Sequence, residues 1–231
     1  ASRERALECL RQGQPLLLLK SNALSTVHRR APIDLVVLPI REDGAVVGLS
    51  IHAGLWTSAA LHAAPTDVPV LRRNLAALEG RFGFAPTGHA GKSLAHALTS
   101  LPHDLTTAFP QDALETLALT AMSIADRPRS RVVLIRSPLG RHLFAFVWLQ
   151  RDDLSTGRRN AIGDLLCEAA HGRLLSWTIA VEGDAAMIRY MIDLRGEGRL
   201  PDAAELDRRV ERMVRGWSPA IESALGEIAP A

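Results

Sequence analysis

The apolar run from Leu143 to Leu149 constrains the fold more than any other feature of this sequence. Alternate side chains of a β-strand point to opposite faces, so Phe144, Phe146 and Trp148 share one face and aliphatic residues occupy the other. A strand with two apolar faces is typical of a sheet that is covered on both sides. We expect helices to cover one face, and another domain or subunit of the same protein to cover the other.

The segments around this run predict an α+β unit. Strands are expected over 132–136, 143–149, 174–181 and 187–194. A helix capped by Ser155 or Thr156 and ended by His171-Gly172 separates the two strand pairs. A last helix begins at Pro201, and its apolar stripe consists of Leu206, Val210, Met213, Trp217 and Ile221. The order ββαββα predicts an antiparallel sheet with two helices on one face, close to the ferredoxin-like arrangement.

Ahead of this unit the sequence predicts a smaller sheet and then helices. A helical stretch ends near Gly13, and strands over 32–40 and 46–51 form a hairpin, to which residues 16–19 supply a third strand. From Val70 to Asp126 the apolar residues recur with a helical period, interrupted by glycines and prolines. We therefore divide the chain into residues 1–63, a helical connector over 64–126, and residues 127–231.

Composition limits the possible functions. The 231 residues include 27 Lys plus Arg and 25 Asp plus Glu, so a net charge of +2 predicts no strong attraction to nucleic acid or an anionic membrane. The two cysteines cannot build a disulfide framework or a cysteine-rich zinc site, which favours the cytoplasm. Because the sequence starts without methionine and without a signal peptide, we expect a segment of a longer protein.

Several short patterns resemble active-site motifs but lack essential residues. The run Gly48 to His52 has histidine where a nucleophile elbow needs glycine, and Gly88 to Ser93 lacks the first glycine of a phosphate loop, although the helix expected after Gly91 has free amides. Histidines at 89, 96 and 103 would lie about 10 Å apart on one helix, too far for one metal ion. We expect no metal site and assign these histidines to the surface or to helix ends.

The aromatic residues of the apolar run also resemble the stacking residues of RNA-recognition sheets. The basic residue and glycine of such a motif are displaced here, to Gly140-Arg141, and both faces of the strand are apolar. We interpret the run as a buried central strand, and keep an independent ligand- or RNA-binding module as the alternative.

Longer stretches of the chain resemble consecutive motifs of the large bacterial NAD-dependent glutamate dehydrogenases. These stretches agree in order and spacing across nearly the whole chain. They are Lys20-Ser21-Asn22, Ser25 to Arg29, Gly54 to Ala60, Val68 to Arg73, Gly91 to Leu94, Gly140-Arg141, and Gln150-Arg151-Asp152 with Thr156 and Arg158.

This resemblance implies a role for each part of the chain. It implies a PAS-like α/β remnant over 1–63 and an ACT-like α+β domain over 127–231, in the N-terminal half of a homo-oligomeric enzyme that deaminates glutamate oxidatively to 2-oxoglutarate. The chain lacks a GxGxxG turn, so we expect no catalytic and no cofactor-binding residues in it, and NAD only in the parent enzyme. Its expected role is regulation and assembly, with other domains and subunits as partners.

The sequence departs from the family pattern at Ala90, His103, Ser137 and His142, where an acidic residue, an arginine, an aspartate and an aromatic residue are usual. The order ββαββα also differs from the usual ACT order βαββαβ. Effector binding that used these polar positions is therefore expected to be altered.

The loop between the apolar strand and the following helix is the predicted effector site. ACT-type domains bind amino acids near such loops. Arg151 and the free helix amides suit a carboxylate, and Asp152 or Asp153 suits an ammonium group, with Thr156 at the helix start. The alternative is a solvated turn in which Ser155 or Thr156 only caps the helix.

Overall fold

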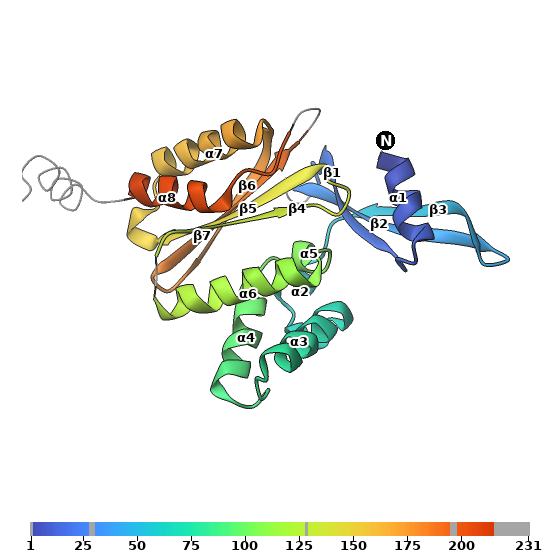
Figure 1. Cartoon of the computed structure of the whole chain (residues 1–231), viewed down its shortest axis with the longest axis horizontal. Coiled ribbons are helices and arrows are strands. Elements are labelled where there is room, and N and C mark those ends of the chain that lie inside the picture. Colours follow the sequence, from blue (N-terminus) through green and yellow to red (C-terminus); the bar gives the residue numbers. More distant parts are fainter. Residues whose placement is uncertain (1, 28–30, 128, 195–197, 215–231) are drawn as a thin grey trace, which may run out of the picture.

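A computed structural model describes residues 2–27, 31–127, 129–194 and 198–214 (Figure 1). Its first part is a three-stranded antiparallel sheet, here called the first sheet, in the order β1-β2-β3. Its elements are α1 (Ser2–Arg11), β1 (Leu17–Leu24), β2 (Pro32–Glu42) and β3 (Ala45–Gly54). The predicted hairpin and third strand are confirmed. Asp43 and Gly44 join β2 to β3 with positive φ angles of 48° and 82°, as a two-residue hairpin turn requires.

The middle of the chain is helical, as expected, and is called the helical layer here. It comprises α2 (Ser58–His62), η1 (Pro65–Asp67), α3 (Pro69–Phe82), α4 (His89–Ser100), α5 (His103–Thr106) and α6 (Gln111–Asp126). Its core is built from leucines that recur with the helical period, and Leu78, Leu94, Leu114 and Leu117 are each 0% exposed.

The last part is a four-stranded antiparallel sheet, the second sheet, in the order β4-β5-β7-β6. It comprises β4 (Arg131–Arg136), β5 (His142–Gln150), η2 (Arg151–Asp153), α7 (Thr156–Ala170), β6 (Arg173–Glu182), β7 (Ala185–Asp193) and α8 (Ala203–Val214). The predicted order ββαββα is confirmed. Moving β4 behind α8 gives βαββαβ, so this arrangement is a circular permutation of the ferredoxin-like order.

Both faces of the second sheet are covered, as the apolar run predicted. Leu143 and Val147 pack with α7 and α8 on one face. Phe144 and Phe146 pack on the other face against the helical layer, where Phe109 meets Phe146 edge to face at 6.1 Å. Figure 1 shows α7 and α8 on one side of this sheet and α6 on the other. The covering layer is thus the helical layer of the same chain.

Helix α8 is fixed to the edge strand β4 by Asp207. One of its carboxylate oxygens accepts from the backbone N–H of Val132 at 2.8 Å, and the other lies 2.5 Å from the guanidinium of Arg131. Leu206 and Val210 of the predicted apolar stripe are buried. Trp217 and Ile221, the predicted end of that stripe, lie outside the described residues.

The described residues contain no helix with both the length and the apolar character needed to cross a bilayer.

Candidate functional site

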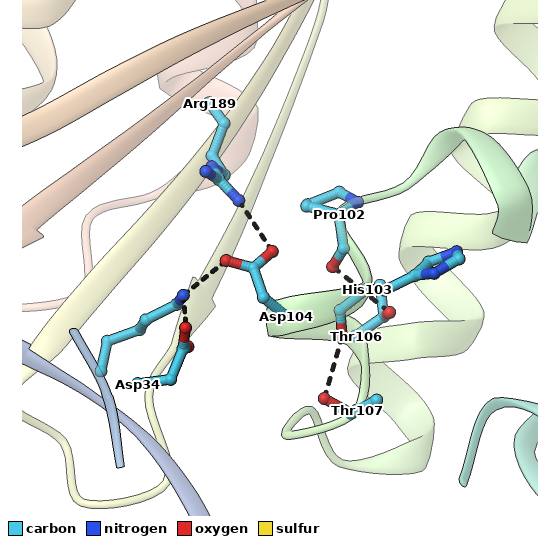
Figure 2. Close-up of polar contacts among 8 residues, drawn as sticks. Asp34, Pro102, His103, Asp104, Thr106, Thr107 and Arg189 are labelled. Carbon is cyan, nitrogen blue, oxygen red and sulfur yellow. Dashed lines mark hydrogen bonds and ion pairs between the residues drawn. The ribbon is translucent and has the colours of Figure 1, made fainter. Parts of the chain in front are cut away.

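A charge network, largely shielded from solvent, joins the first sheet, the helical layer and the second sheet. Lys20 Nζ on β1 lies 2.5 Å from Asp34 Oδ1 on β2 and 2.5 Å from Asp104 Oδ2 on α5. The other oxygen of Asp104 lies 3.3 Å from the guanidinium of Arg189 on β7. Figure 2 shows Asp104 between Arg189 on one side and Asp34 on the other. One carboxylate of the helical layer therefore binds a cation from each sheet.

The local structure explains these positions. Lys20 and Asp34 face each other in the antiparallel register of β1 and β2, so their side chains leave the first sheet on the same face. Asp104 lies in the first turn of α5, where the Thr106 hydroxyl donates to the Pro102 carbonyl at 3.3 Å. The side chains of Lys20 and Asp104 are 7% and 9% exposed. Burial raises the pKa of Asp34, and the neighbouring Lys20 opposes this increase.

A second polar contact joins the two sheets directly. Asn22 of β1 accepts from His142 Nε2 of β5, and its amide nitrogen donates to Asp193 Oδ2 of β7 at 2.9 Å. Burial lowers the pKa of His142 to about 4, although Asp193 favours its protonated form. At neutral pH the imidazole is therefore uncharged, and its hydrogen lies on Nε2, facing the Asn22 oxygen.

The three regularly spaced histidines have different environments. His103 is 0% exposed and its Nδ1 donates to the Ala60 carbonyl at 3.2 Å, so it does not lie at the surface; it lies at a helix end, as the first residue of α5, inside the core. The exposed His96 of α4 pairs with Glu182 of β6 at 2.6 Å. Within the described ranges, no three His, Cys, Asp or Glu side chains gather as metal ligands would.

The expected helix start after Gly91 is also corrected, because α4 begins at His89 and contains Gly91 in its first turn. A Cβ atom at Gly91 would lie 2.2 Å from the Ala85 carbonyl oxygen, so this glycine permits a close backbone approach.

The predicted effector loop forms a small pocket of about 380 Å³, lined by Gln150, Arg151, Asp152 and Asp184. The backbone N–H of Arg151 donates to the Asp184 carbonyl at 2.8 Å, which holds the loop against the β6–β7 turn. Two of the four predicted residues, Arg151 and Asp152, therefore meet at one hollow.

The other two predicted residues are placed differently. Asp153 pairs with Arg158 at 3.0 Å. Thr156 is exposed and is the first residue of α7, while the Ser155 side chain caps the helix by accepting from the backbone of Arg158. Asp153 and Thr156 do not line the hollow.

The four residues at which the sequence departs from the family pattern have different environments. His142 contributes to the polar contact between the two sheets, and Ser137 Oγ accepts from the backbone of His142 at 2.9 Å. His103 is buried within the helical layer, where it donates to the Ala60 carbonyl. Ala90 lies on α4 beside a larger hollow of the helical layer. The aromatic residues considered for RNA stacking, Phe144, Phe146 and Trp148, are 3%, 0% and 5% exposed.

Sequence reasoning missed most of the charge network and the contact of Asn22 with Asp193, because the residues that meet there lie up to 171 residues apart in the chain. One feature of the sequence indicated these contacts. Lys20 and Asn22 are polar residues that follow an apolar run, and they belong to a stretch that resembles the family.

Comparison with known proteins agrees with the resemblance found in the sequence. Residues 68–127 match the family model of the glutamate dehydrogenase helical motif 1, and residues 131–218 match that of the glutamate dehydrogenase ACT2 domain. The NAD-specific glutamate dehydrogenase of Pseudomonas aeruginosa is 31% identical over 227 residues, which are 96% of this chain and 14% of that protein. The enzyme of the same name from Halomonas elongata is 28% identical over 207 residues, or 88% of this chain and 13% of that protein. The chain thus spans about one seventh of the length of these relatives.

Proposed function

We propose that this chain is a regulatory and assembly segment. The chain carries the helical motif 1 and the ACT2 domain of the glutamate dehydrogenases, and it therefore belongs to that family. The parent protein is proposed to be a cytoplasmic NAD-dependent enzyme that deaminates L-glutamate oxidatively to 2-oxoglutarate. In this proposal the chain itself supplies no catalytic residue and no part of the NAD site.

The observation that carries this proposal is the contact of Lys20, Asp104 and Arg189. Each of these residues belongs to a different part of the molecule, and Asp104 binds both cations. A shift of one part must break or rebuild this contact, and breaking a buried ion pair is costly. Such an element favours discrete arrangements over gradual deformation, which suits a segment that transmits regulation.

The edge of the second sheet supports a role in assembly. β6 is an edge strand, and Trp177, Ile179 and Val181 on it are 42%, 37% and 49% exposed. An exposed apolar edge is a place where another chain or domain packs. We assign this surface to other domains or subunits of the same homo-oligomeric enzyme.

The effector is proposed to be an amino acid bound at the loop that contains Arg151, Asp152, Asp153 and Thr156. Arg151 and Asp152 offer opposite charges at the hollow next to Asp184, as the carboxylate and ammonium groups of an amino acid require. Asp153, held by Arg158, fixes the loop, and Thr156 starts the helix behind it.

The test uses the parent enzyme. Arg151→Ala and Asp152→Ala should shift the half-maximal concentration of an amino-acid effector several-fold and leave turnover without effector unchanged. Asp112→Ala, an exposed position on α6, is the matched control. Unchanged effector curves in both loop variants would remove the loop from the proposal. NAD binding by the purified chain in calorimetry would contradict the non-catalytic role.

A further inference from the structure

A hollow of about 690 Å³ lies between the helical motif 1 and the ACT2 domain; it adjoins the smaller hollow at Arg151 and shares only Asp184 with it among the described lining residues. Its walls come from α4 and α6 on one side and from β5, β6, β7 and the β6–β7 turn on the other. Sites for small ligands usually have volumes of roughly 300–1,000 Å³ and lie between structural units. The hollows along α7 and α8 are smaller, about 400 and 590 Å³.

The lining has two chemical zones. Apolar side chains form the floor, among them Trp148, Ile124, Met122 and Met187, and Trp148 is only 5% exposed. Acidic side chains stand at the rim, where Asp126 ends α6, Glu182 ends β6 and Asp184 lies in the turn; all three are exposed.

Acidic side chains predominate among the charged groups that line this hollow. Among the described residues that line this hollow, none is a lysine or an arginine, and its remaining titratable groups are His89 and His96. His96 of α4 pairs with Glu182 of β6 at 2.6 Å, so a contact crosses from the helical motif 1 to the ACT2 domain at this rim. The local potential favours a cation and opposes carboxylates and phosphates.

We propose that this hollow binds a small organic amine, with its ammonium group at Asp126 and Asp184 and its apolar body on the floor at Trp148. The ligand contacts both units at once, so its binding stabilises their present arrangement. The site is independent of the reaction that the parent enzyme performs. It differs from the loop site in its occupant, because it offers no guanidinium for the carboxylate of an amino acid.

The experiment titrates the purified chain in calorimetry with 2-phenylethylamine, and with 3-phenylpropionate as a probe of similar shape and opposite charge. We expect the amine to bind at one site, at least ten-fold more tightly than the carboxylate. Asp126→Asn and Asp184→Asn should each weaken amine binding about three- to ten-fold, as the loss of one partly exposed charge interaction does. Asp112→Asn, on α6 away from the hollow, should leave it unchanged.

A second readout locates the ligand. The amine should change tryptophan fluorescence, and Trp148→Phe should abolish most of that change, whereas Arg151→Ala should leave both binding and fluorescence intact. Absence of amine binding, equal binding of the carboxylate, or unchanged affinity in both aspartate variants would each overturn the proposal. A loss of binding in Arg151→Ala alone would place the amine in the loop pocket and count against this site.

Discussion

The two sheets of this molecule are covered to different extents. The central strands of the second sheet are buried on both faces, and Leu143, Phe146 and Ile188 in these strands are each 0% exposed. The first sheet has a smaller core with α1, and Ile40 and Ile51 on its strands remain 47% and 60% exposed. Apolar burial therefore stabilises the second sheet far more than the first.

The first sheet therefore depends on its polar contacts to the rest of the chain. Lys20 and Asn22 of β1 reach Asp104, His142 and Asp193, which belong to the helical layer and the second sheet. A sheet that has little core of its own is thus held in place by a few directional contacts, and single substitutions can release it.

Truncation of matched leucines gives the largest expected effect. Leu143 and Leu10 are both 0% exposed, the first on β5 and the second on α1. Leu143→Ala should lower the free energy of unfolding by about 5 kcal/mol and Leu10→Ala by about 2–3 kcal/mol, because a small cluster collapses more easily around a lost side chain. Urea titration followed by circular dichroism measures both. Equal losses would remove the contrast between the sheets.

Loss of the central cation should release the first sheet. Lys20→Met leaves Asp34 and Asp104 close together without their shared partner, which costs about 3 kcal/mol or more. Hydrogen exchange should accelerate in residues 17–54 and remain slow in residues 142–150. Lys92→Met, at the other lysine of the chain, is the exposed control. Uniform acceleration in both sheets would show that they unfold as one unit.

The contact of Asn22 with His142 predicts a pH dependence. The pKa of His142 is about 4 in the folded protein and 6.5 ordinarily, so the unfolded chain binds more protons between these values. Stability should therefore fall as the pH decreases from about 6.5 towards 4, by at most about 1.4 kcal/mol per unit. The raised pKa of Asp34 acts in the opposite direction just above pH 3.8, where the folded state binds more protons.

His142→Phe, the aromatic type usual in the family, isolates the histidine contribution, because Asp34 is present in both proteins. The difference in stability between variant and parent chain should flatten above pH 7 and change steadily between pH 6.5 and 4. A difference that does not depend on pH would exclude His142 as the titrating group.

Helix caps give the smallest effect. Ser155 caps the fifteen-residue α7 on the second sheet, and Thr57 caps the five-residue α2, which follows the first sheet in the chain. Ser155→Ala should cost about 1 kcal/mol, and Thr57→Ala less, because α2 buries none of its residues. Thermal unfolding of the two variants checks this order, and a larger effect at Thr57 would reverse it.

The regular part of the fold was predictable from the sequence, and the polar contacts were not. Alternation and helical periodicity are local, so they predicted the strands on both sides of Arg41–Gly44 and the order ββαββα. The contacts of Lys20 with Asp104 and of Asn22 with Asp193 depend on packing between distant segments, which no local pattern contains. The proposed loop site illustrates both cases: Arg151 and Asp152 meet at one hollow, whereas Asp153 forms an ion pair with Arg158.

A double-mutant cycle on Lys20 and Asp104 tests most directly the claim that this ion pair joins the first sheet to the helical motif 1. Lys20→Met, Asp104→Asn and the double variant are compared with the parent chain in urea titrations. We expect the double variant to lose about 2 kcal/mol less than the sum of the single losses, because each single change removes one of the ion pairs of a buried charge that remains. Losses that add within about 0.5 kcal/mol would show that the two residues do not interact and that this ion pair does not hold the first sheet to the helical motif 1.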